Sequence, residues 1–423
     1  MKTVPYWKDS FSRPADLPSH VPPREVDVAI VGGGYTGLHA ALRLAKQGVS
    51  AAVLEQGQIG NGASAVNGGQ VAPGLKLPIK KVFQKYGPTL GRQLWDGSLA
   101  AVEHLEQTLA AEQINCDYTH GGGLALAYRP AHYEAMQADA EWLARNLDFH
   151  QVEVVPRERI REEIGSDRFY GGLVEKLGGG LQPAKYVYGL AQAVARAGAC
   201  ICENTKVLKL SRTGNSFQVT TGRGNIKANH VLIATNGYTT GLVKAIQRRI
   251  FTVGSYMITT APLSPAMQHE LSPKNRVMYD TKWFLNYFCL TADGRMAIGG
   301  RNNLSPDLDV VESARNLAAM LVQIFPQLQG IPITHTWTGQ LGITFNVMPY
   351  IGQVDGIYHA FGYGGHGVAL SGYLGKEVAD LISGQSSYSP FAEISPETSV
   401  FYHGRAWFLP VVASYYRYLD KVS

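Results

Sequence analysis

The sequence predicts an α/β fold (α+β overall), in which a discontinuous Rossmann-like domain carries a second domain built on an antiparallel sheet. Three observations support this prediction. Strand–glycine–helix patterns occur near both ends of the chain, at 26–47 and 356–382. The stretch from 251 to 301 is instead rich in β-branched and aromatic residues between turn signals. The length of 423 residues exceeds the size at which one hydrophobic core usually stops growing.

The first regular elements follow a Pro-rich start at 1–25. The apolar run at 26–31 predicts a buried parallel strand, and the next strand is expected at 50–54. Between them, 37–47 carries apolar residues at helical spacing. These three elements together form a βαβ unit.

A glycine-rich polar run at 57–74 follows the βαβ unit. It is too long for a simple connector, and loops of this length inside a domain are usually functional or disordered. Helical patterns return at about 84–113 and 131–147. Between them, "YTHGGGLALAY" at 118–128 predicts a pair of strands.

The second half of the chain changes from helical to strand-rich and back. A glycine turn, a helix and a strand are expected within 178–201, and a buried strand ending in a polar turn at 230–238. Four β-rich segments between 251 and 301 predict an antiparallel sheet. A helix around 310–325 and a strand at 333–339 lead to the last strand–glycine–helix pattern. The predicted domains are an N-terminal extension at 1–25, a first domain at 26–85, 150–245 and 340–385, a second domain at 86–149 and 246–339, and a C-terminal extension at 386–423.

Composition and charge exclude several classes of protein. The formal net charge is only +5 and the basic residues are scattered, so no nucleic-acid partner is expected. No segment approaches the ~20 apolar residues of a membrane span, so no integral membrane segment is expected. The four cysteines show neither metal-ligand spacing nor a disulfide framework, which predicts a cytoplasmic protein without a metal site.

The clearest motif is a G-x-G-x-x-G formed by Gly32, Gly34 and Gly37 between the first strand and its helix. The first glycine turns the chain, the second lets a pyrophosphate approach the backbone, and the third lets helix and strand pack closely. Glu55 at the end of the next strand can accept hydrogen bonds from ribose hydroxyls. The alternative, a tight turn without a ligand, does not explain the acidic residue. The motif therefore predicts a bound dinucleotide, either FAD or NAD.

Two further segments favour FAD. The polar run at 60–70 could line the middle of a longer cofactor, although a surface loop would have the same composition. Near the other end, glycines flank His366 just before a helix that begins at about 368. A helix N-terminus there suits the negative charge that develops on a reduced isoalloxazine ring. His366 itself could equally have a structural role.

Several separated segments together resemble the FAD-dependent amine and amino-acid oxidases of the D-amino-acid oxidase (glycine oxidase-like) superfamily. They are "DVAIVGGGYTGLHAAL", "LEQGQIGNGASAVNGGQVAPG", "HVLIATNGY", "TWTG" and "FGYGGHGVALSGYLGKEVADL". The segments "PYWKDS", "GGGLQPAKYVYGLAQAVARAGA" and "WFLPVVASYYRYLD" look more like the γ-glutamylputrescine oxidase branch. The resemblance implies a discontinuous Rossmann-like FAD-binding domain and an antiparallel-sheet substrate domain. Because no cysteine follows Cys289 and the loop at 60–70 lacks histidine, we expect FAD to be bound non-covalently.

The resemblance also implies a reaction. A hydride would pass from the carbon that bears an amine to flavin N5, the imine would hydrolyse to an aldehyde or keto acid, and O2 or another electron acceptor would reoxidise the flavin. The substrate would be a small-molecule amine or amino acid. The implied FAD contacts are Gly32, Gly34, Tyr35, Thr36, Gly37, Glu55, Gln56, Ala63, Ser64, Asn67, Gly68, Gly69, Gln70, Val207, Thr235, Asn236, Gly237, Trp337, Gly364, Gly365, His366, Gly367 and Val368.

The substrate side is less determined, because the chain departs from the branch pattern at Cys289, where an arginine is common, and at Asn346, where an aspartate is common. Two alternatives therefore remain. The substrate could be an amino acid or N-alkylglycine, or the chain could be a flavoprotein subunit that needs a partner. The candidate catalytic residues are His366, Tyr256, Trp283, Trp337 and Arg301. The aromatic residues could surround an amine through cation–π contacts or simply pack on the sheet. Arg301 could bind a carboxylate or lie in solvent.

Overall fold

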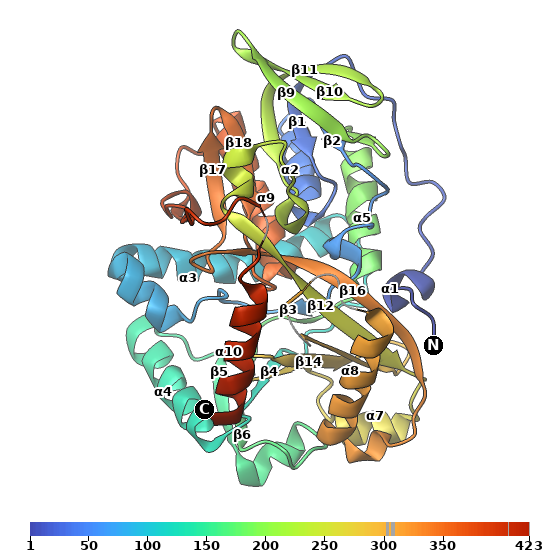
Figure 1. Cartoon of the computed structure of the whole chain (residues 1–423), viewed down its shortest axis with the longest axis vertical. Coiled ribbons are helices and arrows are strands. Elements are labelled where there is room, and N and C mark those ends of the chain that lie inside the picture. Colours follow the sequence, from blue (N-terminus) through green and yellow to red (C-terminus); the bar gives the residue numbers. More distant parts are fainter. Residues whose placement is uncertain (302–303, 306–308, 405, 423) are drawn as a thin grey trace.

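The computed structural model describes residues 1–301, 304–305, 309–404 and 406–422, which fold around two large sheets (Figure 1). The first sheet has the order β17-β18-β11-β1-β2-β8, and its four central neighbours β18, β11, β1 and β2 run parallel. The ribbon β9–β10 extends β11 in antiparallel fashion. The strands are β1 (Glu25–Val31), β2 (Ala51–Leu54), β8 (Cys200–Cys202), β9 (Val207–Thr213), β10 (Ser216–Thr221), β11 (Gly224–Ile233), β17 (Tyr350–Val354) and β18 (Ile357–Phe361).

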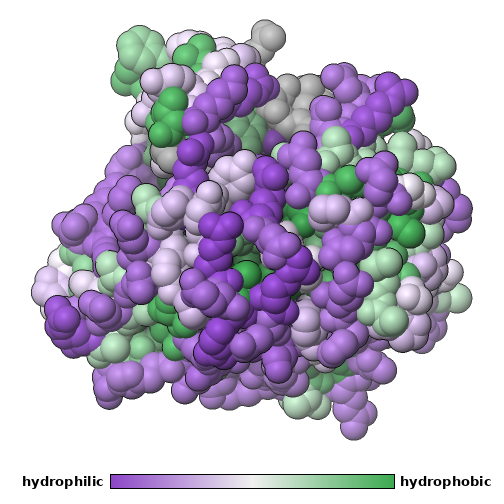
Figure 2. Space-filling view, turned by 90° about the horizontal axis from the view of Figure 1, so that it is seen from below, coloured by the Kyte–Doolittle hydropathy of each residue, from purple (hydrophilic) through white to green (hydrophobic). Residues whose placement is uncertain are grey.

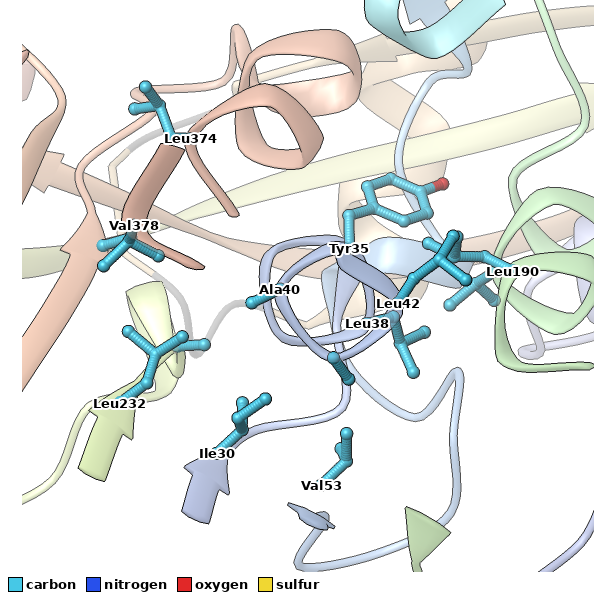
Figure 3. Close-up of a cluster of buried hydrophobic side chains, with 14 of the residues drawn as sticks. Ile30, Tyr35, Leu38, Ala40, Leu42, Val53, Leu190, Leu232, Leu374 and Val378 are labelled. Atoms are coloured by element: carbon cyan, nitrogen blue, oxygen red, sulfur yellow. The ribbon is translucent and has the colours of Figure 1, made fainter. Parts of the chain in front are cut away.

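Helices drawn from distant parts of the sequence cover this sheet. Helix α2 packs on both α5 and α9, and α3 packs on α9. Figure 3 shows Leu38 of α2 above Ile30 of β1 and Val53 of β2, with Leu190 of α5 on one side and Leu374 of α9 on the other. All five side chains are fully buried. The helices are α2 (Tyr35–Lys46), α3 (Ile79–Ala111), α5 (Pro183–Arg196) and α9 (Gly367–Ser383).

The second sheet has the order β16-β12-β15-β14-β13-β4-β6-β5 and is antiparallel except where β13 meets β4. Its apolar faces are covered by helices, and seen from this end the molecular surface is mostly hydrophilic (Figure 2). The strands are β4 (Gly123–Leu126), β5 (Val152–Pro156), β6 (Gly171–Glu175), β12 (Ile250–Thr260), β13 (Val277–Asp280), β14 (Asn286–Leu290), β15 (Met296–Gly300) and β16 (Ile333–Thr344). The helices around it are α4 (Pro130–Leu147), α7 (Pro265–Leu271), α8 (Val310–Ile324) and α10 (Leu409–Val422).

Short elements complete the chain. A two-stranded pair joins the glycine-rich run to the segment before α5. The N-terminal extension begins with a single helical turn whose Tyr6 and Trp7 are buried. The short elements are α1 (Tyr6–Asp9), α6 (Lys244–Gln247), β3 (Gln70–Val71), β7 (Gly179–Gly180), η1 (Ala63–Ala65), η2 (Arg157–Glu162), η3 (Asn236–Tyr238), η4 (Pro326–Leu328) and η5 (Pro390–Ala392).

The structure differs from the sequence prediction at 118–128. The predicted pair of strands is wrong, because only β4 forms there, and it pairs with β6 and β13. Gly122 has a positive φ of 68° and turns the chain, so the residues before it contribute a single bridge from Thr119 to Gly180. Strands β5 and β6 also lie in the second sheet, although the predicted boundary at 150 assigned them to the first domain.

A buried chain of polar side chains lies where α2, α3, α5 and α9 meet. His39 Nε2 is 2.8 Å from Tyr186 Oη, and His39 Nδ1 is 3.0 Å from His104 Nε2. A Cβ atom on Gly372 of α9 would lie 2.7 Å from His39 Nε2, so the helices have no spare room here. Burial lowers the pKa of His39, and burial together with Lys376 and Arg43 lowers the pKa of His104 to about 4.

We expect the free energy of unfolding to fall as the pH falls from about 6.5 to about 4. The unfolded chain, with ordinary histidine pKa values of about 6.5, then binds more protons than the folded chain. Urea unfolding of wild type and of His104→Gln at pH 7, 5.5 and 4.5 measures this effect, and the variant should lose distinctly less stability on acidification. Exposed His150 provides the control, since His150→Gln should follow wild type. If the free energy of unfolding fell equally with pH in wild type and in His104→Gln, the pH dependence could not be assigned to His104.

Candidate functional site

A cavity of about 400 Å³ opens at the carboxyl ends of the central strands of the first sheet. This is the edge at which open α/β sheets bind their ligands. Both ends of the polypeptide contribute to its wall, so the two glycine-rich turns predicted to share a ligand do meet. The lining residues are 31–36, 54–57, 60–64, 67, 206–207, 233–236, 238–240, 242–243, 340–342, 363, 365, 367–368 and 371.

The β1–α2 turn forms one end of this cavity. Gly32 has a positive φ of 110°, and a Cβ atom on Gly37 would lie 2.0 Å from the Gly32 carbonyl oxygen, so both positions require glycine. Gly34 is the N-cap of α2 and lines the cavity. The N–H of Tyr35 donates to Ser64 Oγ at 3.1 Å. The N-terminus of α2 therefore points bare backbone at the cavity, as a pyrophosphate requires.

Glu55 follows β2, and its side chain lies at the same end of the cavity as the β1–α2 turn. Its Oε2 accepts from the Gly33 N–H at 2.9 Å, and its Oε1 accepts from the Gly57 N–H at 2.9 Å. These bonds hold the carboxylate at the cavity wall, where Val207 from β9 also lies. A carboxylate beside a bare glycine turn matches the ribose and pyrophosphate of a dinucleotide, so the residues present fit the predicted cofactor.

The glycine-rich run is an ordered wall, not a free loop. Asn67 Nδ2 donates to the carbonyls of Ala63 and Ser64 at 3.1 and 3.2 Å, and Asn67 Oδ1 accepts from the Gly69 N–H at 2.8 Å. Two indoles fix it from outside, because Trp7 Nε1 donates to the Asn67 carbonyl at 2.8 Å and Trp337 Nε1 donates to the Val66 carbonyl at 2.8 Å. Side chains from both sides of the molecule thus hold this segment.

The second glycine turn precedes α9. Gly364 and Gly365 have positive φ values of 60° and 92°, and Gly365, Gly367 and Val368 line the cavity. His366 is the N-cap of α9, and its Nε2 lies 2.9 Å from the Pro73 carbonyl oxygen. Burial lowers the pKa of His366, so the imidazole is neutral near pH 7. His366 therefore joins the glycine-rich run to the turn, and the positive end of the α9 dipole faces the cavity.

Two cationic side chains converge on this turn. A Cβ atom on Gly364 would lie 3.1 Å from Lys76 Cγ, and one on Gly365 would lie 3.8 Å from Arg301 Nη2. Burial and the positive charge of Arg301 lower the pKa of the Lys76 ammonium to about 8. Within the part of the chain that the structure describes, no carboxylate acts on either side chain. Two neighbouring cations at a helix N-terminus without an acidic partner have the charge that attracts an anion.

The aromatic candidates do not form one cage. Tyr256 pairs with Thr338, whereas Trp337 pairs with Met257, so the two side chains project from opposite faces of the second sheet. Tyr256 is buried against the α8 side and donates to the Ser305 carbonyl at 3.1 Å. Trp283 is 48% exposed, and its ring stacks on Tyr416 of α10 at 5.0 Å. Of the five candidate catalytic residues, the structure brings only His366 and Arg301 to the glycine turn.

Some predicted cofactor residues lie behind the cavity wall. Gly68 faces the Tyr287 ring, Gly69 lies against the Leu181 carbonyl, and Gly237 lies against the Gly342 backbone. Gln70 Nε2 donates to the Met278 carbonyl at 3.0 Å. The predicted residues in the lining are Gly32, Gly34, Tyr35, Thr36, Glu55, Gln56, Ala63, Ser64, Asn67, Val207, Thr235, Asn236, Gly365, Gly367 and Val368, and those outside it are Gly37, Gly68, Gly69, Gln70, Gly237, Trp337, Gly364 and His366.

Sequence reasoning missed Lys76 and the lining segment at 340–342. The signal for the latter is Gly342 within β16, because a glycine inside a strand marks a close approach of another group. A Cβ atom there would lie 2.5 Å from Asn236 Oδ1. No local pattern distinguishes Lys76 from other lysines.

Comparison with known proteins gives consistent matches over most of the chain. The family model described as "DAO: FAD dependent oxidoreductase" matches residues 27–381. The gamma-glutamylputrescine oxidoreductase of Escherichia coli K12 is 34% identical over 404 residues, which cover 94% of this chain and 93% of that protein. A probable oxidoreductase OrdL of Haemophilus influenzae is 30% identical over 424 residues, covering 98% and 97%. The crystal structure of glycine oxidase from Geobacillus kaustophilus superposes with a TM-score of 0.74 at 21% identity, covering 89% of this chain and all of that one.

We expect Glu55→Gln to weaken the binding of FAD by roughly tenfold or more, because hydrogen bonds to a charged acceptor contribute about 1.5–3 kcal/mol each. Fluorescence titration of the cofactor-free protein with FAD measures the dissociation constant. Glu25→Gln, on the exposed end of β1, is the matched control. Equal dissociation constants for wild type and Glu55→Gln would show that Glu55 does not contact the cofactor.

We expect the dissociation constant of a simple dicarboxylate such as glutarate to rise about tenfold as the pH passes through about 8. Lys76 then loses the proton that attracts the anion, while burial shifts the pKa of His366 downward and that of Tyr287 upward, away from this range. Spectral titration of the flavin between pH 7 and 9.5 measures the change. Lys76→Met should bind weakly at every pH, and a pH response retained in that variant would contradict the prediction.

Proposed function

The chain belongs to the DAO family of FAD-dependent oxidoreductases, and we propose that within it the protein oxidises the C–N bond of a small amine that also carries a carboxylate. Membership of this family confirms the predicted fold class, the FAD cofactor and the oxidoreductase class. The names of its relatives refer to an amine and an amino acid as substrates, and our proposal concerns which small molecule this chain oxidises.

The similarity to gamma-glutamylputrescine oxidoreductase and the pair Lys76 and Arg301 support the proposed substrate class. A γ-glutamyl conjugate of a diamine has an aliphatic amine at one end and a carboxylate at the other. A site with two unpaired cations among the described residues suits the carboxylate end and repels a plain diamine. The observation that carries the proposal is therefore the convergence of these cations on the turn that precedes α9.

Cys289 and Asn346, the two residues that depart from the branch pattern, do not add a charged group to the site. Burial raises the pKa of the Cys289 thiol to about 12, and its Sγ faces the Gly68 carbonyl at 4.0 Å. Asn346 accepts from the Tyr350 hydroxyl, and its Nδ2 donates to Tyr86 Oη at 3.3 Å. Both side chains are thus neutral packing groups, and recognition of an anion falls to Lys76 and Arg301.

In this reaction the protein mainly binds and orients the cofactor and the substrate. FAD, when bound, supplies the acceptor for the hydride and passes the electrons on, by our proposal, to O2 with formation of H2O2. The turn residues Gly32 and Gly34 and the carboxylate of Glu55 hold the dinucleotide in place. Lys76 and Arg301 orient the substrate through its carboxylate, so that the amine is presented to the α9 turn. Orientation is the main contribution of the side chains, and no dedicated general base is required. The product imine would hydrolyse to an aldehyde.

A second candidate is the oxidation of an amino acid or an N-alkylglycine, which the same cations favour because these substrates also carry a carboxylate. A third, from another class, is a flavoprotein subunit that depends on a partner for its chemistry. We place the activity in the cytoplasm, in line with the four cysteines, which are all free thiols.

An anaerobic screen of flavin bleaching separates these functions. The purified protein alone is mixed with γ-glutamylputrescine, putrescine, glycine, sarcosine and D-alanine, and the absorbance near 450 nm is followed. Rapid bleaching by γ-glutamylputrescine but not by putrescine supports the proposal. Bleaching by the amino acids alone favours the second candidate, and no bleaching by any of them favours the partner-dependent subunit. Oxygen consumption with the reactive substrate then tests O2 as the acceptor.

We expect Arg301→Ala to raise KM for substrates with a carboxylate by roughly 100-fold, because a charge-assisted bidentate contact is lost. The reaction of an amine without a carboxylate should change less than threefold, since it does not use this contact. Steady-state rates with both kinds of substrate measure the difference. Arg295→Ala, on the turn before β15, serves as a control for loss of an arginine in the same sheet. A similar loss with both substrates would assign Arg301 to the general structure of the site.

A further inference from the structure

An acidic side chain without a partner lies deep in the second sheet. It belongs to Glu175, the last residue of β6. The neighbouring Val174 packs in the core on the α8 side of the sheet, so Glu175 projects from the opposite face. Across the sheet, Glu175 pairs with Gly123 and Gly123 pairs with Val277, whose side chain belongs to the core of the first domain. The Glu175 carboxylate therefore lies on the face of the second sheet that is turned toward the first domain.

Two tyrosines on this face connect Glu175 with Arg301. Tyr279 and Tyr287 lie directly opposite each other on β13 and β14. Burial and the charge of Glu175 raise the pKa of Tyr279. Burial also raises the pKa of Tyr287, and the positive charge of Arg301 opposes this effect. Each tyrosine thus lies near one of the two charged groups, and the four side chains form a row with the guanidinium at one end and the carboxylate at the other.

The row borders open space inside the molecule. All four side chains are enclosed by protein, yet each keeps part of its surface accessible. Gly123 leaves room beside the carboxylate, because a Cβ atom there would lie 3.3 Å from Glu175 Oε2. At the other end, Arg301 approaches the glycine turn before α9, where the site for the substrate carboxylate is proposed. The Glu175 carboxylate therefore belongs to the surroundings of the substrate.

The Glu175 carboxylate lacks the partner that its position requires. Burial raises the pKa of Glu175 to about 7, and among the described residues no hydrogen-bond donor and no positive charge offsets this effect. A carboxylate in such surroundings is costly to ionise unless a cation comes next to it. A buried acid with a raised pKa that makes no structural contact is a candidate for ligand recognition.

We propose that Glu175 binds an ammonium group of the substrate other than the one that is oxidised. This inference rests on the proposed function, in which Lys76 and Arg301 hold the carboxylate of the same molecule. In a γ-glutamyl conjugate of a diamine, the group at Glu175 is the α-ammonium of the glutamyl part. The aliphatic amine at the other end then remains free to react. The rings of Tyr279 and Tyr287 suit an ammonium group as well, through cation–π contacts.

The same arrangement disfavours a simple α-amino acid. Such a substrate has one amino group, and hydride transfer requires this group in its neutral form. A carboxylate next to an amine stabilises the protonated form instead. Glu175 therefore selects for molecules that carry a second amino group in addition to the carboxylate and the reacting amine.

Two ligands that differ only in the α-ammonium group test the role of Glu175. γ-Glutamylbutylamide, the γ-glutamyl ligand, has the glutamyl part of the conjugate but lacks the terminal amine. The mono-butylamide of glutaric acid, the glutaryl ligand, lacks the α-ammonium group as well. Titration of the full-length FAD-loaded protein with each ligand, followed by the flavin absorbance spectrum, gives the dissociation constants without any substrate turnover.

We expect Glu175→Gln to raise the dissociation constant of the γ-glutamyl ligand roughly 10- to 100-fold, because a charge-assisted hydrogen bond is lost. The dissociation constant of the glutaryl ligand should change less than threefold. This second value also shows that the variant is folded and that its contact with the carboxylate is intact. Glu153→Gln on the neighbouring strand β5, where the side chain is exposed, is the matched control and should bind both ligands like wild type.

Equal losses for the two ligands in Glu175→Gln, or unchanged binding of the γ-glutamyl ligand, would overturn the inference. So would a wild-type protein that binds neither ligand. The proposed function is tested separately by the bleaching of the flavin with γ-glutamylputrescine. If that reaction fails while Glu175→Gln still weakens only the γ-glutamyl ligand, the proposed function is wrong and the role of Glu175 in binding the ammonium group is supported.

Discussion

The site depends on the close approach of α2 and α9. A Cβ atom on Gly375 of α9 would lie 2.4 Å from the Thr36 carbonyl oxygen, and one on Gly372 would meet the His39 ring. Because the two helices touch backbone to backbone, their N-termini open onto one cavity although they begin 332 (367 − 35) residues apart. The positive ends of two helix dipoles then act on the same ligand, which favours the negative charge of a dinucleotide and of a reduced flavin.

The sequence was sufficient for the parts of the molecule that follow local rules. The glycines at 32, 34 and 37, the acidic residue at 55 and the final glycine turn each have a chemical reason within a few residues. The structure brings Gly32, Gly34, Glu55 and the final turn to one cavity, with Gly37 packed behind them against the Gly32 carbonyl. The β-rich segments between 251 and 301 likewise show their pattern locally. The family resemblance added the identity of the cofactor, which the spacing alone left open between FAD and NAD.

The other features of the fold and the site could be recognised only from the three-dimensional structure. Tyr256 and Trp337 looked alike as strand aromatics, but the register between β12 and β16 turns them to opposite faces. Strands β5 and β6 join the second sheet because β4 lies beside β13, a pairing between residues about 150 apart in the chain. Lys76 lies near enough to Arg301 to feel its charge only because the glycine-rich run folds back onto the α9 turn. Contacts of this range have no signature in a single sequence.

The attachment of the glycine-rich run has a consequence for biosynthesis. One indole that holds it, Trp7, leaves the ribosome among the first residues, while the other, Trp337, and helix α9 at the far side of the cavity leave it late. A nascent chain that ends before β16 has the phosphate-binding turn but lacks the lining residues at 340–342, 363, 365, 367–368 and 371. The enclosed cavity is therefore complete only once nearly the whole polypeptide has been synthesised.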